Sequence, residues 1–311
     1  MIEYDTTKEI KFEVVTDLDA ARAVWDALAA HSEIDDEWDF RHLFYRHLGF
    51  PLHFIVAYDG ERPVGLLPLQ LNTGEGPIPQ SYELKHNFLE FFGGDDTDSN
   101  RVLTAPGYEH LVPQLFEQID RPAVLAPLAE PYADAHQYTN KYIADLRGLG
   151  SFPDFLNRYL DGKSRGKMLQ QVNRLERNNE VAVSDGTAAD LPQLFEYNLA
   201  RFGEASSFNY PYRRQVFADL MERYDHDVFT IKINGETKAV GFALIYNNAY
   251  LAMNIGYDYD VRDLGKYIIG VEINRAIERG CDVFDSGKGG GGWKEQFRLE
   301  QLPQYMLTLR G

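Results

Sequence analysis

Hydrophobic and polar positions follow the same plan in two distant parts of the chain. Residues 53–69 consist of an apolar run, the dipeptide Asp59-Gly60 and a second apolar run, and residues 228–245 repeat this order around Asn234-Gly235. Asp-Gly and Asn-Gly favour the positive φ angles that a two-residue hairpin turn requires. The pattern therefore predicts two β-hairpins of the same kind.

Two predicted helices precede each hairpin. Apolar residues recur at helical spacing in residues 18–28, 40–48, 191–199 and 216–224. A repeated unit of two helices and a hairpin indicates that one fold occurs twice in the chain. We predict an α/β protein with mixed α+β sheets and two similar lobes in tandem, the first at residues 1–150 and the second at residues 151–311.

The second lobe has the more regular pattern. Its hairpin is followed by a predicted strand at 249–257, a loop, a long helix from Lys266 to Arg279 and a short strand at 283–284. After the first hairpin the chain becomes irregular and rich in glycine and proline from Gly74 onwards. No glycine-bearing loop precedes a long helix there. We therefore expect the active site in the second lobe.

A predicted helix at residues 163–179, between the two copies, is basic. Its positively charged residues are Lys163, Arg165, Lys167, Arg174 and Arg177. The whole chain has 48 acidic and 31 basic side chains, with a net charge of −17. A solvated helix face is the ordinary role of such residues. Contact with an anionic ligand is the alternative, and the acidic background makes it more attractive.

Composition narrows the class of protein. Hydrophobic residues make up 44% of the chain, which is enough for a folded core. No apolar run approaches the ~20 residues of a membrane-spanning helix, and the charged N-terminus does not resemble a signal peptide. The lone Cys281 cannot form an intrachain disulfide. We expect a cytoplasmic protein without a membrane span, and the acidic balance argues against broad binding of nucleic acid.

The sequence lacks the motifs of several other enzyme classes. Its eight histidines form no H-E-x-x-H or comparable metal pair, and there is no G-x-S-x-G elbow. The glycine run at 289–292 fits neither a Walker loop nor a dinucleotide-binding G-x-G-x-x-G in its usual context. We therefore expect no metal cofactor, and we reject metal, serine and cysteine hydrolases and the two nucleotide-binding folds.

Three short segments carry a family resemblance. They are Lys163-Ser164-Arg165 with Arg174-Leu175-Glu176-Arg177, the helix end Ala200-Arg201-Phe202, and Phe284-Asp285-Ser286-Gly287-Lys288 followed by Trp293-Lys294-Glu295-Gln296-Phe297. In this order, and with these elements between them, they resemble the GNAT acyltransferases. More narrowly, the chain resembles the tandem-GNAT proteins of the FemAB-like, CelD/BcsL-type acetyltransferase group. Trp293 stands where that family commonly has a tyrosine.

The resemblance implies a reaction. Members of the family transfer an acyl or aminoacyl group from an activated carrier to an amine, and their donors include acyl-coenzyme A and aminoacyl-tRNA. The first GNAT copy is usually degenerate and helps to shape the acceptor cleft. The resemblance therefore implies an acyltransferase that uses acyl-CoA as its donor and a small-molecule or peptide amine as its acceptor.

The predicted donor site is the start of the long helix. Unpaired amides and the positive end of the helix dipole favour an anion there. The family's donor loop usually reads Arg/Gln-x-x-Gly-x-Gly/Ala, and this chain matches it at Arg262 and Gly265 but departs at Tyr267. Lys266 adds a positive charge that can meet a phosphate. The hypothesis requires that this helix start presents unpaired amides to the carrier; an ordinary loop-to-helix turn is the alternative.

Candidate catalytic groups follow the predicted strands of the second lobe. Asp285 comes just after a buried strand and is placed to accept the ammonium proton or to orient the acceptor, although capping of the glycine loop is as reasonable a role. Tyr257 ends the third strand and is a candidate for polarising the carbonyl, with packing as its alternative. The candidate substrate-binding residues, each with a solvated or structural alternative, are Lys163, Arg165, Arg201, Lys288, Trp293 and Lys294.

Two rival functions remain open from the sequence. One is an aminoacyl-tRNA-dependent transferase of FemAB type, which the basic helix favours and the net charge disfavours. The other is a GNAT-like binding module that has lost its chemistry, which the bulky Tyr267 in the donor loop favours.

Overall fold

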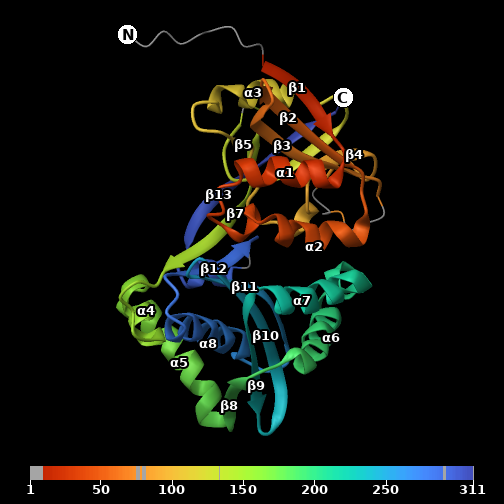
Figure 1. Cartoon of the computed structure of the whole chain (residues 1–311). Coiled ribbons are helices and arrows are strands. Elements are labelled where there is room, and N and C mark those ends of the chain that lie inside the picture. Colours follow the sequence, from red (N-terminus) through yellow and green to blue (C-terminus); the bar gives the residue numbers. More distant parts are fainter. Residues whose placement is uncertain (1–9, 75–77, 79–81, 133, 290–291, 311) are drawn as a thin grey trace, which may run out of the picture. The chain divides into compact units, whose positions relative to one another are not determined.

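A computed structural model of the chain describes residues 10–310 apart from 75–77, 79–81, 133, 290 and 291 (Figure 1). The chain divides into two compact units, of which the first contains residues 1–139 and 303–311 and the second contains residues 140–302. Two strands, β7 (His136–Asp145) and β13 (Glu300–Leu309), cross this division. The boundary between GNAT-like lobes at residue 150 stays a prediction.

The first unit contains a mixed sheet with the strand order β1-β2-β3-β4-β6-β13, and β5 pairs with β3. Its other strands are β1 (Ile10–Val15), β2 (Leu52–Asp59), β3 (Arg62–Asn72), β4 (Phe88–Phe91), β5 (Leu103–Thr104) and β6 (Ala123–Leu128). Helices α1 (Leu18–Leu28) and α2 (Trp38–Leu48) supply Trp25 and Trp38 to a core on one face. Helix α3 (Val112–Glu117) supplies Leu115 to a second core.

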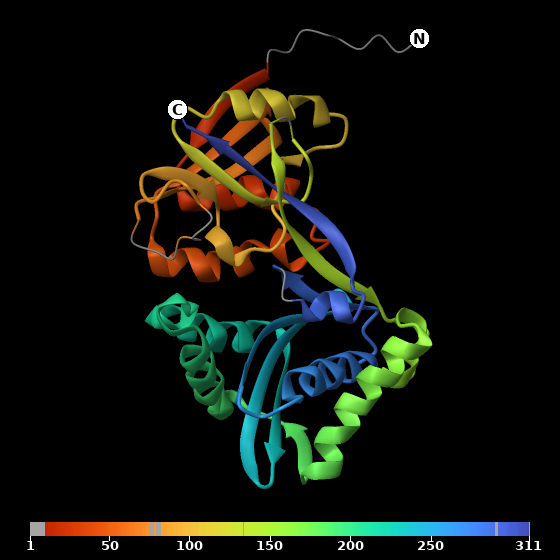
Figure 2. The same cartoon turned by 180° about the vertical axis from the view of Figure 1, so that it is seen from behind.

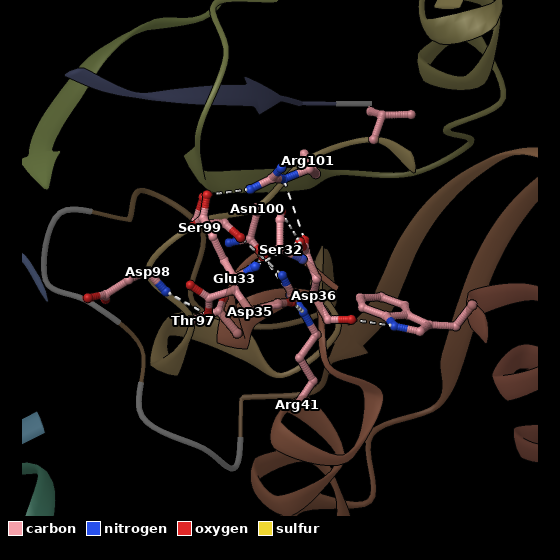
Figure 3. Close-up of polar contacts among 12 residues, drawn as sticks. Ser32, Glu33, Asp35, Asp36, Arg41, Thr97, Asp98, Ser99, Asn100 and Arg101 are labelled. Carbon is pink, nitrogen blue, oxygen red and sulfur yellow. Dashed lines mark hydrogen bonds and ion pairs between the residues drawn. The ribbon is translucent and has the colours of Figure 1, made fainter. Parts of the chain in front are cut away.

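A buried polar network fixes one edge of the first unit (Figure 3). The Arg41 side chain is 2% exposed and donates hydrogen bonds to the Phe92 and Ser99 carbonyls and to the Asn100 side chain, at 2.8, 3.1 and 2.6 Å. Asp36 accepts the backbone amide and the hydroxyl of Ser32 at 3.0 and 2.7 Å. Burial lowers the pKa of Arg41 to about 10, so its guanidinium stays charged at neutral pH. The network ties the loop around Asn100 to helix α2.

The second unit contains a sheet with the strand order β7-β12-β11-β10-β9-β8 (Figures 1 and 2). Its strands besides β7 are β8 (Val181–Asp185), β9 (Asp225–Ile233), β10 (Glu236–Tyr246), β11 (Ala249–Tyr257) and β12 (Val283–Lys288). Among the described strands of this sheet, only β11 and β12 pair in parallel, and helix α8 (Leu264–Glu278) makes the crossover between them. Parallel neighbours require such a crossover, which explains the long helix in the sequence.

Helices cover both faces of this second sheet. Helices α4 (Phe152–Tyr159), α5 (Gly162–Asn178) and α8 form a core with Tyr250 and Phe284 on one face. On the other face, α6 (Leu191–Phe202) and α7 (Pro211–Arg223) pack Phe195 and Phe217 together and bring Phe217 against Phe242 of β10. A short helix, α9 (Trp293–Gln296), precedes β13. The predicted α/β class with mixed sheets is confirmed.

The repeated plan seen in the sequence is present in the structure. Two helices precede each hairpin, α1 and α2 before β2–β3 and α6 and α7 before β9–β10. The second turn lies at Asn234-Gly235, both with positive φ, as predicted. The first turn lies one residue later than predicted, because Asp59 pairs with Arg62 and leaves Gly60 and Glu61 as the turn.

A buried ion-pair cluster anchors helix α8 to the sheet. Asp227 of β9 is fully buried and accepts hydrogen bonds from Tyr250 at 2.9 Å, from Arg275 at 2.7 and 2.6 Å and from Arg279 at 2.8 Å. Burial alone raises the pKa of Asp227, but hydrogen bonding and the charge of Arg275 outweigh it and hold the pKa below its ordinary value. The C-terminal half of α8 is therefore fixed against β9.

Gly256 allows α6 to lie directly on β11, and its replacement is expected to be destabilising. A β-carbon at Gly256 would overlap the Leu194 backbone carbonyl, which no side-chain rotation relieves. Gly256→Ala should lower the free energy of unfolding by about 1–3 kcal/mol or more. Gly166→Ala is the matched control, because Gly166 lies inside α5 with open space at its β-carbon position. That change should stabilise by about 0.5–1 kcal/mol. Urea unfolding measures both, and equal effects would contradict the close packing.

Candidate functional site

The pairing between β11 and β12 stops early. Ala249, Tyr250 and Leu251 pair with Val283, Phe284 and Asp285, and no later residues of the two strands pair. Strand β11 nevertheless continues to Tyr257, paired on its other side with β10. Backbone amides and carbonyls on a strand edge need hydrogen-bond partners. From Ala252 onwards, β11 therefore presents an edge that an extended ligand can pair with.

A β-bulge lies at the point where this edge begins. On β10, Phe242 pairs with Asn254 and the next residue, Ala243, pairs with Ala252, so Met253 is the extra residue. Bulges are common beside active sites because they redirect backbone groups locally. The apolar pattern of residues 249–257 contains no sign of this bulge, because one extra residue in a short strand does not break the predicted strand.

Asp285 lies where the two strands part. Its carboxylate forms an ion pair with Lys141 of β7 at 2.8 Å, and it accepts the Gly287 amide at 2.9 Å. Both charged side chains are only about one-tenth exposed. The partial burial strengthens the pair and fixes the carboxylate's direction. Lys141 was not among the predicted residues, because it comes from a strand that is distant in the sequence.

Tyr257 lies far from Asp285. Asp285 pairs with Leu251, and Tyr257 is six residues further along β11, which corresponds to about 20 Å of extended chain. The Tyr257 hydroxyl instead lies 2.7 Å from the position of a β-carbon on Gly265, at the start of α8. It also accepts a hydrogen bond from Arg201 at 3.4 Å. The structure therefore does not bring Asp285 and Tyr257 together, whereas it does bring Tyr257 together with Gly265 and Arg201. The catalytic roles of Asp285 and Tyr257 stay predictions.

The start of α8 presents fewer free amides than the sequence suggested. The Leu264 amide donates to the Val261 carbonyl, and the amides of Lys266 and Tyr267 both donate to the Asp263 carbonyl. Among the described residues, only the Gly265 amide of this first turn lacks an acceptor. Asp263 has a left-handed conformation, with φ of 67°, which allows the sharp entry into the helix.

Helix α5 holds the start of α8 through three polar contacts. Arg174 forms a two-point ion pair with Asp263 at 2.7 and 2.8 Å. The two further contacts join Lys266 to Gln171 at 2.7 Å and Tyr267 to Glu176 at 3.0 Å. The Tyr267 ring is buried against α5, so this bulky residue points towards the neighbouring helix.

Positive charge gathers near the same helix start. Burial lowers the pKa of Lys266, and the charge of nearby Lys167 lowers it further. Lys167 is exposed and, within the described part of the chain, has no acidic partner. Arg262 is also exposed. A phosphate near Gly265 would thus meet one free amide, the helix dipole and several positive charges.

The predicted basic helix divides into residues with different surroundings. Arg174 is occupied by Asp263, and Arg165 donates to the Asn157 side chain at 2.6 Å. Lys163 and Arg177 are exposed, as Lys167 is. The solvated helix face and the ligand-binding role thus remain open for the exposed residues, while Arg174 has a structural role beside the donor loop.

The residues around the glycine run also differ from one another. Lys294 is 6% exposed, and its ammonium donates to the carbonyls of Ser286, Gly287 and Lys288 at 2.8, 2.9 and 3.0 Å. These bonds use all three ammonium protons, so Lys294 holds the end of β12 and does not face an open surface. Trp293 is half-buried and packs edge-on against Phe297. Gly290 and Gly291 lie outside the described residues.

A buried carboxyl in α8 escaped the sequence analysis. Glu272 is completely buried, and neither carboxyl oxygen has a hydrogen-bond partner among the described residues. Burial is the main cause that raises the pKa of Glu272, the nearby charge of Asp227 adds to it and that of Lys294 opposes it, and together they bring the pKa to about 8. Its only sequence signal is a glutamate on a helix face that is otherwise apolar.

No group of three or more histidine, cysteine, aspartate or glutamate side chains is arranged to hold a metal ion in the part of the chain that the structure describes. No helix among the same residues combines the length and the apolar character that crossing a membrane requires.

Part of the chain matches a known domain family. Residues 162–295, slightly less than half of the chain, match a family model described as an acetyltransferase (GNAT) domain. No curated protein sequence matches the chain. The fold is similar to that of FemX, with a TM-score of 0.58 and 10% identity over 96% of this chain and 97% of that one.

Two further solved structures are similar along nearly their whole length. L-PGS from Bacillus licheniformis has a TM-score of 0.52 and 13% identity, covering 95% of this chain and 92% of that one. A tandem GNAT protein from the clavulanic acid biosynthesis pathway has a TM-score of 0.51 and 10% identity, covering 96% and 98%. The resemblance predicted from the three sequence segments is confirmed. Residues 162–295 match the GNAT domain model, and the chain shares the fold of FemX and of the tandem GNAT protein along almost its entire length.

Proposed function

We propose that the second unit transfers an acyl group from an acyl-CoA-type thioester to an amine, as an N-acyltransferase of EC class 2.3. The observation that carries this proposal is the early end of the β11–β12 ladder, which leaves the edge of β11 from Ala252 to Tyr257 beside the start of α8. An elongated carrier fits such an edge, with its anionic part at the helix start. Because acyl-CoA is an intracellular donor, we propose a cytoplasmic protein.

The donor's phosphates are assigned to the start of α8. Gly265 supplies the free amide, and Lys266 and Arg262 supply positive charge from the same turn. Tyr257 is reassigned from the reacting carbonyl to this end of the donor, because its hydroxyl lies against Gly265. The carrier then extends along β11 towards the Met253 bulge, where its acyl group lies near Asp285.

The chemistry is assigned to the region where the strands part. The neutral amine nitrogen attacks the thioester carbonyl carbon, a C–N bond forms and the C–S bond breaks, and the departing thiolate becomes the thiol by taking up the proton that the amine has lost to the base. The proton lost by the amine passes to a base, and Asp285 is the proposed base or acceptor-orienting group, with Lys141 fixing its position. Lys288 at the end of β12 and Trp293 at the start of α9 remain proposed acceptor contacts. Lys294 supports this region by holding the end of β12.

Calorimetry with acetyl-CoA tests the donor assignment. Wild-type protein should bind it, and Lys266→Met should weaken binding about 10-fold, as expected for the loss of one charge-assisted phosphate contact. Lys232→Met is the matched control, because Lys232 is an exposed lysine on β9, and strands β10 and β11 separate β9 from β12 in the sheet. Absence of binding by wild-type protein, or equal loss in both variants, would contradict the proposal.

The second candidate function is aminoacyl transfer from tRNA, as in FemAB-type proteins. The observation that favours it is the row of exposed basic side chains on α5, where Lys163, Lys167 and Arg177 have no acidic partner among the described residues. If these residues contact tRNA, their joint replacement by methionine should reduce both tRNA affinity and the slope of its salt dependence. Arg174 is unsuitable for this test because it pairs with Asp263.

The remaining alternative is a GNAT-like module without catalysis. Its sequence support was Tyr267, and this side chain is directed towards Glu176 of α5. Donor binding without turnover of any amine acceptor would favour this alternative.

A further inference from the structure

An aromatic and cationic cluster lies at the C-terminal end of α6. The Arg201 guanidinium lies 3.9 Å from the centre of the Tyr259 ring and 4.9 Å from that of Phe202. The rings of Tyr257 and Tyr259 are 3.8 Å apart. Phe202 and Tyr259 are 46% and 39% exposed, which is unusual for large aromatic side chains. We call Arg201, Phe202, Tyr257 and Tyr259 the arginine platform.

The arginine platform is positively charged, and the part of the chain that the structure describes supplies it with no counter-ion. Within the described residues, no carboxylate lies at ion-pair distance from Arg201, although the chain has 48 acidic side chains. Arg201 donates to the Tyr257 hydroxyl at 3.4 Å, and a guanidinium has five N–H donors. The arginine therefore retains donors for an anion while its flat face is ordered by the rings.

The platform adjoins the proposed donor site. Tyr257 belongs to the platform, and its hydroxyl is 2.7 Å from the position of a β-carbon on Gly265. Gly265 carries the free amide at the start of α8. At the other end, Gly203 directly follows Phe202 and lines an open depression with Leu199, Glu204 and Asn209. The platform therefore lies next to the helix start to which the phosphates are assigned, and the open depression lies next to the platform.

These surroundings suit a planar base joined to phosphate. Aromatic side chains and arginine bind nucleobases by stacking, and the contact tolerates different bases because each has a flat π-face. Both donors considered above end in an adenosine phosphate. We propose that the arginine platform binds the adenine nucleotide of the donor, with the base stacked on Tyr259 and Phe202 and a phosphate beside Arg201. This inference rests on the proposed function, because it assumes that the donor's phosphates lie at α8.

Binding of donor fragments tests the platform. The probes are adenosine 3′,5′-bisphosphate, which lacks the pantetheine arm, and 4′-phosphopantetheine, which lacks the nucleoside. Tyr259→Ala and Arg201→Met should each weaken binding of the bisphosphate about 10-fold and leave 4′-phosphopantetheine binding unchanged. Tyr259→Phe should retain binding, because stacking needs the ring and not the hydroxyl. Tyr210→Ala is the matched control, since Tyr210 is an exposed tyrosine (37%) whose ring packs against Tyr212 and not against the platform.

The outcomes separate this inference from the proposed function. If Tyr259→Ala binds the bisphosphate as tightly as wild-type protein does, the proposed role of the platform is wrong. If Lys266→Met still weakens acetyl-CoA binding in that case, the proposed function is retained. Failure of wild-type protein to bind acetyl-CoA or either fragment would overturn both. A single-stranded oligoribonucleotide ending in CCA is the second probe. If it binds more tightly than the bisphosphate, and Tyr259→Ala weakens its binding, the platform is supported and the bound adenosine is that of a tRNA end.

Discussion

Asp285→Asn should lower kcat/KM for acyl transfer by about 100-fold or more while leaving the affinity for acetyl-CoA unchanged. A positioned proton acceptor contributes roughly 10²–10⁴-fold to such reactions, and the amide cannot take the proton. Asp285 lies at the last pair of the β11–β12 ladder, whereas the donor's phosphates are assigned to the far end of β11. Initial rates with a panel of amine acceptors and calorimetry with the donor measure the two quantities separately.

Two controls separate a chemical effect from a structural one. Asp285→Asn leaves the largely buried Lys141 without its ion-pair partner, which by itself destabilises the protein. The double variant Asp285→Asn/Lys141→Met removes both charges and should recover stability but not activity. Asp282→Asn changes a carboxylate that precedes β12 and should leave the rate intact. Recovery of activity in the double variant would mean that Asp285 only maintains the fold.

The architecture followed from local patterns in the sequence. Turn dipeptides such as Asn234-Gly235 and apolar residues at helical spacing depend on neighbours in sequence, so both hairpins and the helix pairs before them were predictable. The first turn was misplaced by one residue at Gly60, because both Asp-Gly and Gly-Glu satisfy a two-residue turn and only the strand register decides between them.

The site was predicted less completely because it depends on tertiary pairing. Lys141 meets Asp285 only through the register of β7 against β12, which no local pattern encodes. For Arg174 the sequence left a solvated helix face and ligand contact open, and the structure instead pairs it with Asp263, a residue distant in the sequence. Tyr257 was correctly placed at the end of a strand, but the length of β11 carries it away from Asp285. The sequence thus identified plausible residue types, and the strand geometry determined which of them can act together.

Glu272→Gln should remove a strong pH dependence from the stability of the second unit. Glu272 is fully buried without a hydrogen-bond partner among the described residues, and burial raises the pKa of its carboxyl from 4.5 to about 8. Between these values the folded state holds a proton that the unfolded state has released. Stability therefore falls as pH rises, by about 1.4 kcal/mol per pH unit, and the cost is complete above the folded pKa.

Urea unfolding at several pH values measures this effect as a difference in slope. Between pH 5.5 and 7.5, wild-type protein should lose about 3 kcal/mol relative to Glu272→Gln. The glutamine's own unpaired amide adds a penalty that does not vary with pH, so the slopes and not the absolute values are compared. Burial also raises the pKa of Glu90 to about 7, with the same sign, but Glu90 is present in both proteins and its contribution cancels. Parallel pH profiles would show that the Glu272 carboxyl is paired or hydrated in solution. The expectation that burial keeps this glutamate neutral at pH 7 would then be wrong.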